Sequence, residues 1–371
     1  MNLLVLLTDA FGGQGGIAKF NRDLLNALCA HPDMEEVTAL PRTIAGDPGL
    51  LPDRLIYETQ AAGGKGKYVY HLGRLVAQRN SFDGVICAHI HLLPLAALAA
   101  RRYRAPLILV VFGVEAWRPP HIRGLSRSLR CVDTFVSISR FTRERFLAWA
   151  PLRYEQGQII PVCVELSRFG PGPKPAYLLE RYGLSGRRVI ATLARLSKAE
   201  RYKGIDEVLE VMPSLVREMP DLVYLILGDG DDRSRLQSKV CALGMDVHVV
   251  FAGYIPEEEK AAHYRLADAF VMPGRGEGFG IVYLEAMACG IPVVASKADA
   301  SREAVLNGEL GLLVDPDDSQ EIREAITQAL NRPPIFQRQL EFFSLERFVE
   351  RWHEVIDRTF AKPEVALVNV S

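Results

Sequence analysis

The chain has 371 residues, of which 49% are apolar and 24% charged, with a formal net charge of −1. This length exceeds what a single hydrophobic core usually supports, so we expect two domains. The composition excludes a disordered or fibrous protein, and the longest apolar runs fall short of the roughly 18 residues that span a bilayer.

The charge is unevenly distributed along the chain. Residues 1–165 hold 19 Lys+Arg and 14 Asp+Glu, a net charge of +5, and the remainder has −6. An anionic partner or a membrane surface for the N-terminal half and a chance fluctuation are both open interpretations. The six cysteines have no metal-binding spacing, and the apolar run Leu3–Leu7 is too short for a signal peptide. We therefore expect a cytoplasmic protein with reduced cysteines.

The chain opens with a predicted buried strand over Leu3–Leu7, a glycine run from Gly12 to Gly16 and a helical pattern from Ile17 to Leu28. A glycine-rich turn between strand and helix offers free backbone N–H groups, so Gly15 and Gly16 are candidates for binding a phosphate. The spacing Gly13-x-Gly15-x-x-Ala18 also fits, loosely, a dinucleotide fingerprint. An oxidoreductase is therefore one alternative.

Residues 41–68 lack periodicity and are expected to form a long loop or a hairpin. The predicted strand Phe82–Ala88 ends at His89-Ile-His91. Because ligands bind at the carboxyl ends of parallel strands, His91 is a candidate site residue. Glu115 and Arg118 follow the next strand, and they are candidates for contacts with a ligand or for a salt bridge.

Four arginines recur every three to five residues beside apolar positions in the segment 118–130. This pattern favours either a basic amphipathic helix at a lipid surface or a solvated helix face. The arginines are Arg118, Arg123, Arg127 and Arg130.

The second half repeats the alternation of strands and helices after a Gly/Pro linker at 170–176, which predicts a second parallel sheet. Arg195 and Lys203 follow its first strand, where two cations could neutralise an anionic ligand. Asp229-x-Asp231 opens a helix and is interpreted as a turn with an N-cap, not a metal site. The predicted strands are Val189–Ala194, Leu222–Leu227, His248–Ala252, Ala269–Met272, Ile291–Ala295 and Leu312–Val314.

A glycine-rich loop follows the strand Ala269–Met272 and leads into a helix that begins near Ile281 and ends at Cys289-Gly290. The helix N-terminus and the loop suit a phosphate. Glu277 and Glu285 flank this place, and carboxylates accept hydrogen bonds from sugar hydroxyls. The combination predicts a site for a phosphorylated polyol.

Glu277-Gly-Phe-Gly-Ile-Val-Tyr-Leu-Glu285, followed by Ala-Met-Ala-Cys-Gly-Ile-Pro, resembles the Glu-x7-Glu motif of the retaining glycosyltransferases of family 4. The resemblance implies the α/β GT-B fold, with two Rossmann-like parallel-sheet domains facing across a cleft. Residues 1–165 would then form the acceptor domain and residues 166–345 the donor domain. A C-terminal helix over 346–360 would pack back on the first domain.

The resemblance also implies roles for individual residues. Arg195 and Lys203 would bind the donor diphosphate during catalysis, with Glu277 and His91 at the transferred sugar. Further donor contacts are implied for the ribose, the base and the phosphates, at Gly15, Gly16, Tyr254, Phe279, Gly280 and Glu285.

The activity so implied is retaining, metal-independent hexosyl transfer without a cofactor, from a UDP- or GDP-sugar to a hydroxyl of a saccharide or lipid-linked acceptor. Such a reaction belongs to surface polysaccharide or glycolipid biosynthesis. We expect no nucleic-acid partner, and a cytoplasmic location with peripheral contact at the inner membrane surface as an option. A nucleotide-sugar epimerase and a phosphorylase are further alternatives.

Overall fold

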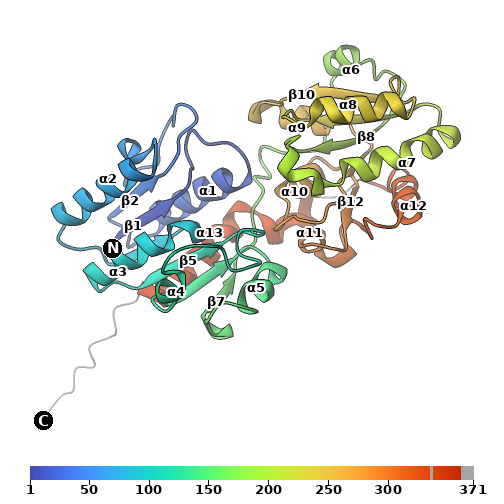
Figure 1. Ribbon diagram of the computed structural model, residues 1–371. Coiled ribbons are helices and arrows are strands. Elements are labelled where there is room, and N and C mark those ends of the chain that lie inside the picture. The colour runs from blue at the N-terminus through green and yellow to red at the C-terminus, as the bar shows by residue number, and fades with distance from the viewer. Residues whose placement is uncertain (335–336, 361–371) are drawn as a thin grey trace, which may run out of the picture. The chain divides into compact units, whose positions relative to one another are not determined.

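The computed structural model describes residues 1–334 and 337–360 (Figure 1). The chain divides into two compact units. Unit 1 contains Met1–Ile138, Thr142–Ile160 and the last helix from Phe348, and unit 2 contains Ser139–Phe141 and Pro161–Arg347. Each unit is built around its own parallel sheet, as the alternation of strands and helices in the sequence predicts.

Within its described residues, unit 1 has a seven-stranded sheet in the order β3-β2-β1-β4-β5-β6-β7, with every pair parallel. The central strands are buried on both faces, which explains their nearly continuous apolar sequences. The strands are β1 (Asn2–Leu7), β2 (Glu36–Pro41), β3 (Leu55–Tyr57), β4 (Gly84–Cys87), β5 (Leu107–Val111), β6 (Thr134–Ser137) and β7 (Gly157–Ile159).

The helices that accompany this sheet are shorter in the middle of unit 1 than at its start and end. They are α1 (Gly16–Ala30), α2 (Lys65–Gln78), α3 (Leu93–Tyr103), α4 (Leu125–Leu129), α5 (Arg140–Leu147) and α13 (Leu345–Phe360).

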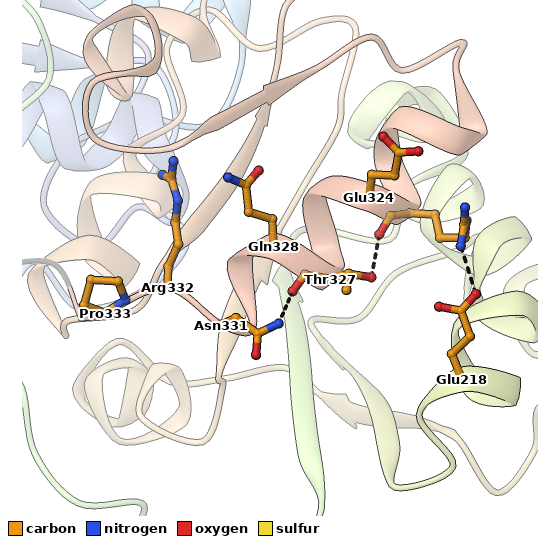
Figure 2. A pocket seen from close by; sticks show the side chains of 8 residues that line it. Glu218, Glu324, Thr327, Gln328, Asn331, Arg332 and Pro333 are labelled. Atoms are coloured by element: carbon orange, nitrogen blue, oxygen red, sulfur yellow. Dashed lines mark hydrogen bonds and ion pairs between the residues drawn. The ribbon is translucent and has the colours of Figure 1, made fainter.

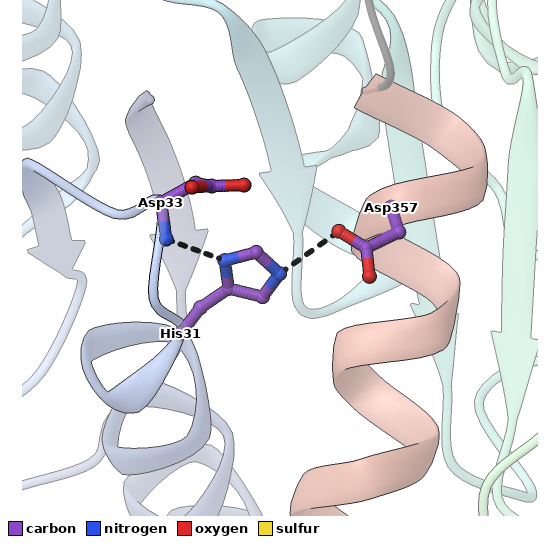
Figure 3. A group of neighbouring side chains, drawn as sticks. All are labelled: His31, Asp33 and Asp357. Atoms are coloured by element: carbon purple, nitrogen blue, oxygen red, sulfur yellow. Dashed lines mark hydrogen bonds and ion pairs between the residues drawn. The ribbon is translucent and has the colours of Figure 1, made fainter.

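Helix α13, red in Figure 1, packs on α1 although more than 300 residues separate them. The ring of Phe348 lies edge-on to that of Phe20 at 5.3 Å between centroids, and Trp352 is fully buried. At the polar end of this contact, His31 Nε2 lies 3.0 Å from Asp357 Oδ1 (Figure 3). The apolar stripe of α13 thus completes the core of unit 1.

In unit 2 the sheet has the order β10-β9-β8-β11-β12-β13, and its six strands within the described residues are again parallel. Its strands are β8 (Arg188–Leu193), β9 (Leu222–Leu227), β10 (Val249–Gly253), β11 (Ala269–Val271), β12 (Val293–Ser296) and β13 (Leu312–Val314). Its helices are α6 (Ala176–Tyr182), α7 (Ile205–Glu218), α8 (Arg233–Ala242), α9 (Lys260–Tyr264), α10 (Ile281–Ala288), α11 (Ser301–Ala304) and α12 (Ser319–Ala329).

The region 41–68 differs from both the expected long loop and the expected hairpin. Pro41 ends β2, Leu55–Tyr57 forms an edge strand that pairs in parallel with β2, and α2 begins at Lys65. A three-residue edge strand is too short to produce a recognisable alternation of apolar and polar residues.

The amphipathic helix suggested for the segment 118–130 is a second correction. Only Leu125–Leu129 is helical, because two consecutive prolines, Pro119 and Pro120, and Gly124 interrupt the segment. All four arginines are exposed. The segment is a basic surface, not a basic helix.

Candidate functional site

The predicted donor residues of unit 2 lie in segments that follow the carboxyl ends of its strands. Arg195 follows β8, Tyr254 follows β10, and the loop that carries Glu277 follows β11. Because β8, β10 and β11 belong to one parallel sheet, these segments emerge at the same edge. This edge is where an open parallel sheet places a ligand.

Arg195, Lys203 and Glu277 are joined in a chain of alternating charges. Lys203 Nζ lies 2.7 Å from Glu277 Oε1 and 3.7 Å from Glu200 Oε2, and the other oxygen of Glu200 accepts from Arg195. The last six residues before Gly204 form a 3₁₀ segment, η4 (Lys198–Lys203), which contains Glu200 and Lys203. The structure therefore brings together the three residues for which the sequence predicts diphosphate and sugar contacts, and it adds Glu200.

Burial and charge act in opposite directions on Lys203. Burial alone would lower the pKa of its ammonium group, but the Glu277 carboxylate and its hydrogen bond outweigh burial and raise the pKa. Lys203 therefore carries its positive charge throughout the neutral range. Arg195 keeps 71% of its side chain exposed, so its guanidinium is open to an incoming anion.

The loop that carries Glu277 is held by close packing that only glycine permits. A Cβ atom on Gly276 would lie 2.6 Å from the ring of Tyr202, and one on Gly204 would lie 2.6 Å from the carbonyl carbon of Pro273. Gly204 also has a φ of +84°, which side chains rarely adopt. In addition, Arg275 N donates to the Tyr202 carbonyl over 2.8 Å. The loop and η4 are thus fixed to each other.

Asp299 is a site residue that the sequence analysis missed. It lies just after β12, and its fully buried carboxylate accepts a hydrogen bond from Glu277 N at 2.8 Å. Burial raises the pKa of Asp299 to about 6 despite the opposing hydrogen bonds from Ser301 and Glu277. The signal in the sequence is weak, since an aspartate after a predicted strand is common in turns.

Helix α10 begins where the sequence predicts, at Ile281, with Gly280 as its N-cap at a φ of +90°. Phe279 is 2% exposed, and its ring packs against that of Phe343 at 5.7 Å, so its side chain belongs to the core of unit 2. Gly280 lies against the ring of Tyr283, and a Cβ atom on Gly280 would come within 2.4 Å of that ring.

Glu285 is fully buried inside unit 2. Its Oε2 accepts from Tyr264 OH at 2.8 Å, and its Oε1 lies 3.6 Å from Lys260 Nζ. A ribose contact at Glu285 would have to replace or share these partners. Tyr254, by contrast, is 60% exposed at the end of β10.

In unit 1, Gly15 is the N-cap of α1 at a φ of +88°, and no side chain caps the helix there. A Cβ on Gly15 or Gly16 would meet nothing within 4 Å. The first turn of α1 therefore presents backbone N–H groups at an exposed surface, as a phosphate site requires.

His91 is exposed just beyond β4, and its backbone N–H donates to His89 Nδ1 over 3.3 Å. His89 is buried, and burial, followed by the nearby His91 and Arg42, lowers its pKa to about 4. His89 therefore stays neutral, and only His91 faces solvent. Glu115 closes its own turn, because its Oε1 accepts from Phe112 N at 2.7 Å and from Gly113 N at 3.1 Å.

Within the described residues, one group of three possible metal ligands has its ligand atoms within 4.8 Å of one another. It consists of His31, Asp33 and Asp357 of unit 1 (Figure 3). Both ring nitrogens of His31 are engaged, Nε2 by Asp357 and Nδ1 by Asp33 N. In the Asp229-x-Asp231 turn, Asp229 bonds Arg233 and Asp231 accepts from Lys198 N. The N-cap of α8 is Asp232, whose side chain does not cap the helix but binds Arg201 and Arg235.

A hollow of about 550 Å³ in unit 2 lies along α12 (Figure 2). Two of its charged groups, Arg323 and Glu218, pair with each other at 2.9 Å. It contains none of the predicted site residues. A smaller cavity is lined by Arg195, Glu200 and Lys203, among others.

In residues 1–334 and 337–360, no helix is both long enough and apolar enough to cross a bilayer.

Residues 181–341 match the family model described as Glycosyl transferases group 1. A GDP-mannose-dependent monoacylated alpha-(1-6)-phosphatidylinositol monomannoside mannosyltransferase of Corynebacterium glutamicum is 31% identical over 352 residues, 89% of each chain. A GDP-mannose-dependent alpha-(1-6)-phosphatidylinositol monomannoside mannosyltransferase of Mycolicibacterium smegmatis is 41% identical over 210 residues, 54% of each chain. In that relative and two from Mycobacterium tuberculosis, the match spans about half of the protein's length.

Among solved structures, Anabaena HepE in complex with UDP and glucose superposes with a TM-score of 0.71 over 96% of this chain and 95% of that one, at 20% identity. At this identity the likeness concerns the fold, and it confirms the expected GT-B class of two Rossmann-like parallel-sheet domains.

Proposed function

Since the chain belongs to the group 1 glycosyltransferases of the family 4 type, we propose that it transfers a mannosyl residue from GDP-mannose to a hydroxyl of a lipid-linked acceptor. The choice of donor follows the relatives, whose names specify GDP-mannose. The acceptor is proposed to be a glycosylated phosphatidylinositol or a similar anionic glycolipid, the class on which those relatives act.

The proposal rests on a row of alternating charges at the carboxyl edge of the unit 2 sheet, formed by Arg195, Glu200, Lys203 and Glu277. Lys203 pairs with the half-buried carboxylate of Glu277, and Arg195 pairs with Glu200, which also lies near Lys203. Cations stabilise the negative charge that develops on a departing diphosphate, and a carboxylate accepts hydrogen bonds from sugar hydroxyls. A nucleoside diphosphate sugar needs both.

In the proposed reaction, the bond between the anomeric carbon and the diphosphate oxygen breaks while the acceptor oxygen bonds to the same face of that carbon. The acceptor proton passes to the leaving phosphate oxygen, so the products are a glycoside with retained configuration and GDP. Arg195 and Lys203 bind the diphosphate as its charge rises, and Glu277 positions Lys203 and the hydroxyls of the sugar. This route needs no protein base.

The remaining expected contacts are part of the proposal. Gly15 and Gly16 donate backbone N–H groups to a phosphate, and His91 contacts the sugar. Tyr254 lies at the base, Gly280 and the backbone of Phe279 bind the donor, and Glu285 accepts from the ribose after exchanging its present partners. We propose that no metal or other cofactor takes part, because the cationic side chains supply the charge that a metal would otherwise contribute.

A peripheral position at the inner membrane surface is proposed from the acceptor class and from the exposed arginines of the segment 118–130. Anionic lipids attract such clusters within a Debye length. From the acceptor class and these arginines we also propose a cytoplasmic location. No nucleic acid is proposed as a partner.

The alternatives receive no support. None of the relatives reported above is an epimerase, a phosphorylase or an oxidoreductase. The fingerprint-like Gly13-x-Gly15-x-x-Ala18 spacing is accounted for by the start of α1, where Gly15 is the N-cap at a φ of +88°.

The test is a transfer assay with radiolabelled GDP-mannose, UDP-glucose and ADP-glucose in the presence of phosphatidylinositol mannoside vesicles. Labelled glycolipid formed from GDP-mannose alone is the expected result, and its anomeric configuration is read by NMR. Lys203→Ala should abolish product, whereas Lys198→Ala, a matched change in the same 3₁₀ segment, should leave it. Absence of product and of GDP binding with every donor would refute the proposal.

A further inference from the structure

The carboxylate of Asp299 has no contact with solvent. Its side chain is fully buried, and burial of a charge costs free energy unless hydrogen bonds offset it. Three donors point at it. Ser301 N and Ser301 Oγ lie 3.0 and 2.6 Å from Oδ1, and Glu277 N lies 2.8 Å from Oδ2. The two oxygens thus serve two different segments.

The Oδ1 contacts have a local explanation. An aspartate that accepts from the backbone N–H two residues later forms an Asx turn, which here starts α11. The Asx turn does not require a hydrogen bond to Oδ2. Oδ2 instead reaches a residue 22 positions earlier in the sequence, at the centre of the Glu277 loop.

Both polar backbone groups of Glu277, the N–H and the carbonyl, are hydrogen-bonded to the loop after β12. Asp299 Oδ2 accepts from its N–H, and its carbonyl accepts from Ala300 N at 3.1 Å. With both groups held, the position of the Glu277 Cα is set by the loop after β12. The side chain that starts there reaches Lys203 Nζ at 2.7 Å. Asp299 therefore acts on Lys203 through Glu277.

We propose that Asp299 is a positioning residue of the donor site, which fixes the Glu277 backbone and through it the Lys203–Glu277 pair. The inference rests on the proposed glycosyl transfer and adds a residue to it. Asp299 does not touch the donor.

The charge of Asp299 gives this role a pH dependence. Burial raises its pKa to about 6, and the groups that face it are Glu277, whose charge raises the pKa further, Ser301, Tyr202 and Tyr283. When Asp299 gains a proton, one oxygen becomes a donor and no longer suits an N–H partner. Below about pH 6 the neutral carboxyl holds the Glu277 N–H less strongly, so the Lys203–Glu277 pair is less well positioned, although burial favours the neutral form and the folded state as a whole is not destabilised.

The experiment compares the wild-type protein with Asp299→Asn and Ser301→Ala in donor-dependent transfer between pH 5 and 8. In the wild type, kcat/KM for the donor should fall about tenfold per pH unit below about 6. Asp299→Asn should lower kcat/KM at neutral pH by at least about tenfold and abolish that fall. Ser301→Ala disturbs the same turn but leaves Oδ2 on Glu277, so it should stay within about twofold of the wild type.

An Asp299→Asn protein that keeps the wild-type acid limb, or that resembles Ser301→Ala in rate, overturns the inference. If Asp299→Asn does not fold, as judged by circular dichroism, the wild-type profile decides, and a flat kcat/KM across pH 6 overturns it. Failure of the proposed function has a different signature, because the wild-type protein itself then transfers nothing at any pH.

Discussion

Lys203 and Glu277 form an ion pair of 2.7 Å in which only 18% and 14% of the respective side chains are exposed. The two residues are 74 positions apart and come from segments that follow different strands, β8 and β11. A pair this well shielded keeps most of its electrostatic strength, unlike an exposed salt bridge. The proposed donor site of unit 2 is therefore held together by contacts within the protein itself.

Removal of either partner of this pair should affect stability and activity together. Lys203→Ala leaves the Glu277 carboxylate without its closest cation and should lower the free energy of unfolding by about 1–3 kcal/mol and kcat by about 100-fold or more. In the double variant with Glu277→Ala, the stability loss should be smaller than the sum of the single losses. Chemical unfolding and single-turnover kinetics measure these effects, and strict additivity would contradict a coupled pair.

The stability of unit 2 should depend on Asp299 between pH 4 and 6. Its folded pKa of about 6 exceeds its ordinary value of 3.8, so the folded state binds the proton more tightly than the unfolded state. The associated stability is complete below pH 4 and is lost as the pH rises through about 6, by up to about 3 kcal/mol. Hydrogen exchange in β12 reports it, and Asp299→Asn should remove this slope.

Because of His89, the stability of unit 1 should depend on pH in the opposite direction. Burial is the main cause that lowers its pKa to about 4 from 6.5, so the unfolded state binds the proton more tightly. Stability is complete above pH 6.5 and falls with decreasing pH towards 4, by up to about 3 kcal/mol. The opening free energy of the β4 amides, obtained from exchange rates divided by the intrinsic rate at each pH, should therefore fall on acidification, and His89→Gln should flatten the response. Equal pH slopes in β4 and β12 would contradict both assignments.

The glycine that ends η4 should resist substitution. Gly204→Ala adds a Cβ within 2.6 Å of the Pro273 carbonyl carbon at a φ of +84°, whereas Gly183→Ala, at a φ of +65°, meets open space. The control bears only the backbone cost of about 1 kcal/mol, and Gly204→Ala should cost at least about 2 kcal/mol more and weaken donor binding. Thermal unfolding and GDP titration compare the two variants, and similar losses would show that the close approach is unimportant.

Most of unit 2 could be predicted from its amino-acid sequence. The strands Leu222–Leu227 and Leu312–Val314 and the helix that begins at Ile281 lie where the pattern predicts, because buried parallel strands are continuous apolar runs and glycines end them. The arginines of the segment 118–130 could not be interpreted in this way, since their spacing resembles a helix while neighbouring prolines and a glycine prevent one.

The residue types of the proposed site can be recognised in the amino-acid sequence. The cations, the two glutamates and the glycine loops are visible as residue types at strand ends, and local backbone preferences decide where strands end. The tertiary structure alone decided which of these groups meet. Lys203 reaches Glu277, Asp299 holds the Glu277 backbone, and Glu285 turns inward to Tyr264, because parallel pairing aligns strand ends that are distant in the sequence. A periodicity within one segment carries no information on that alignment, which depends on the packing of the whole sheet.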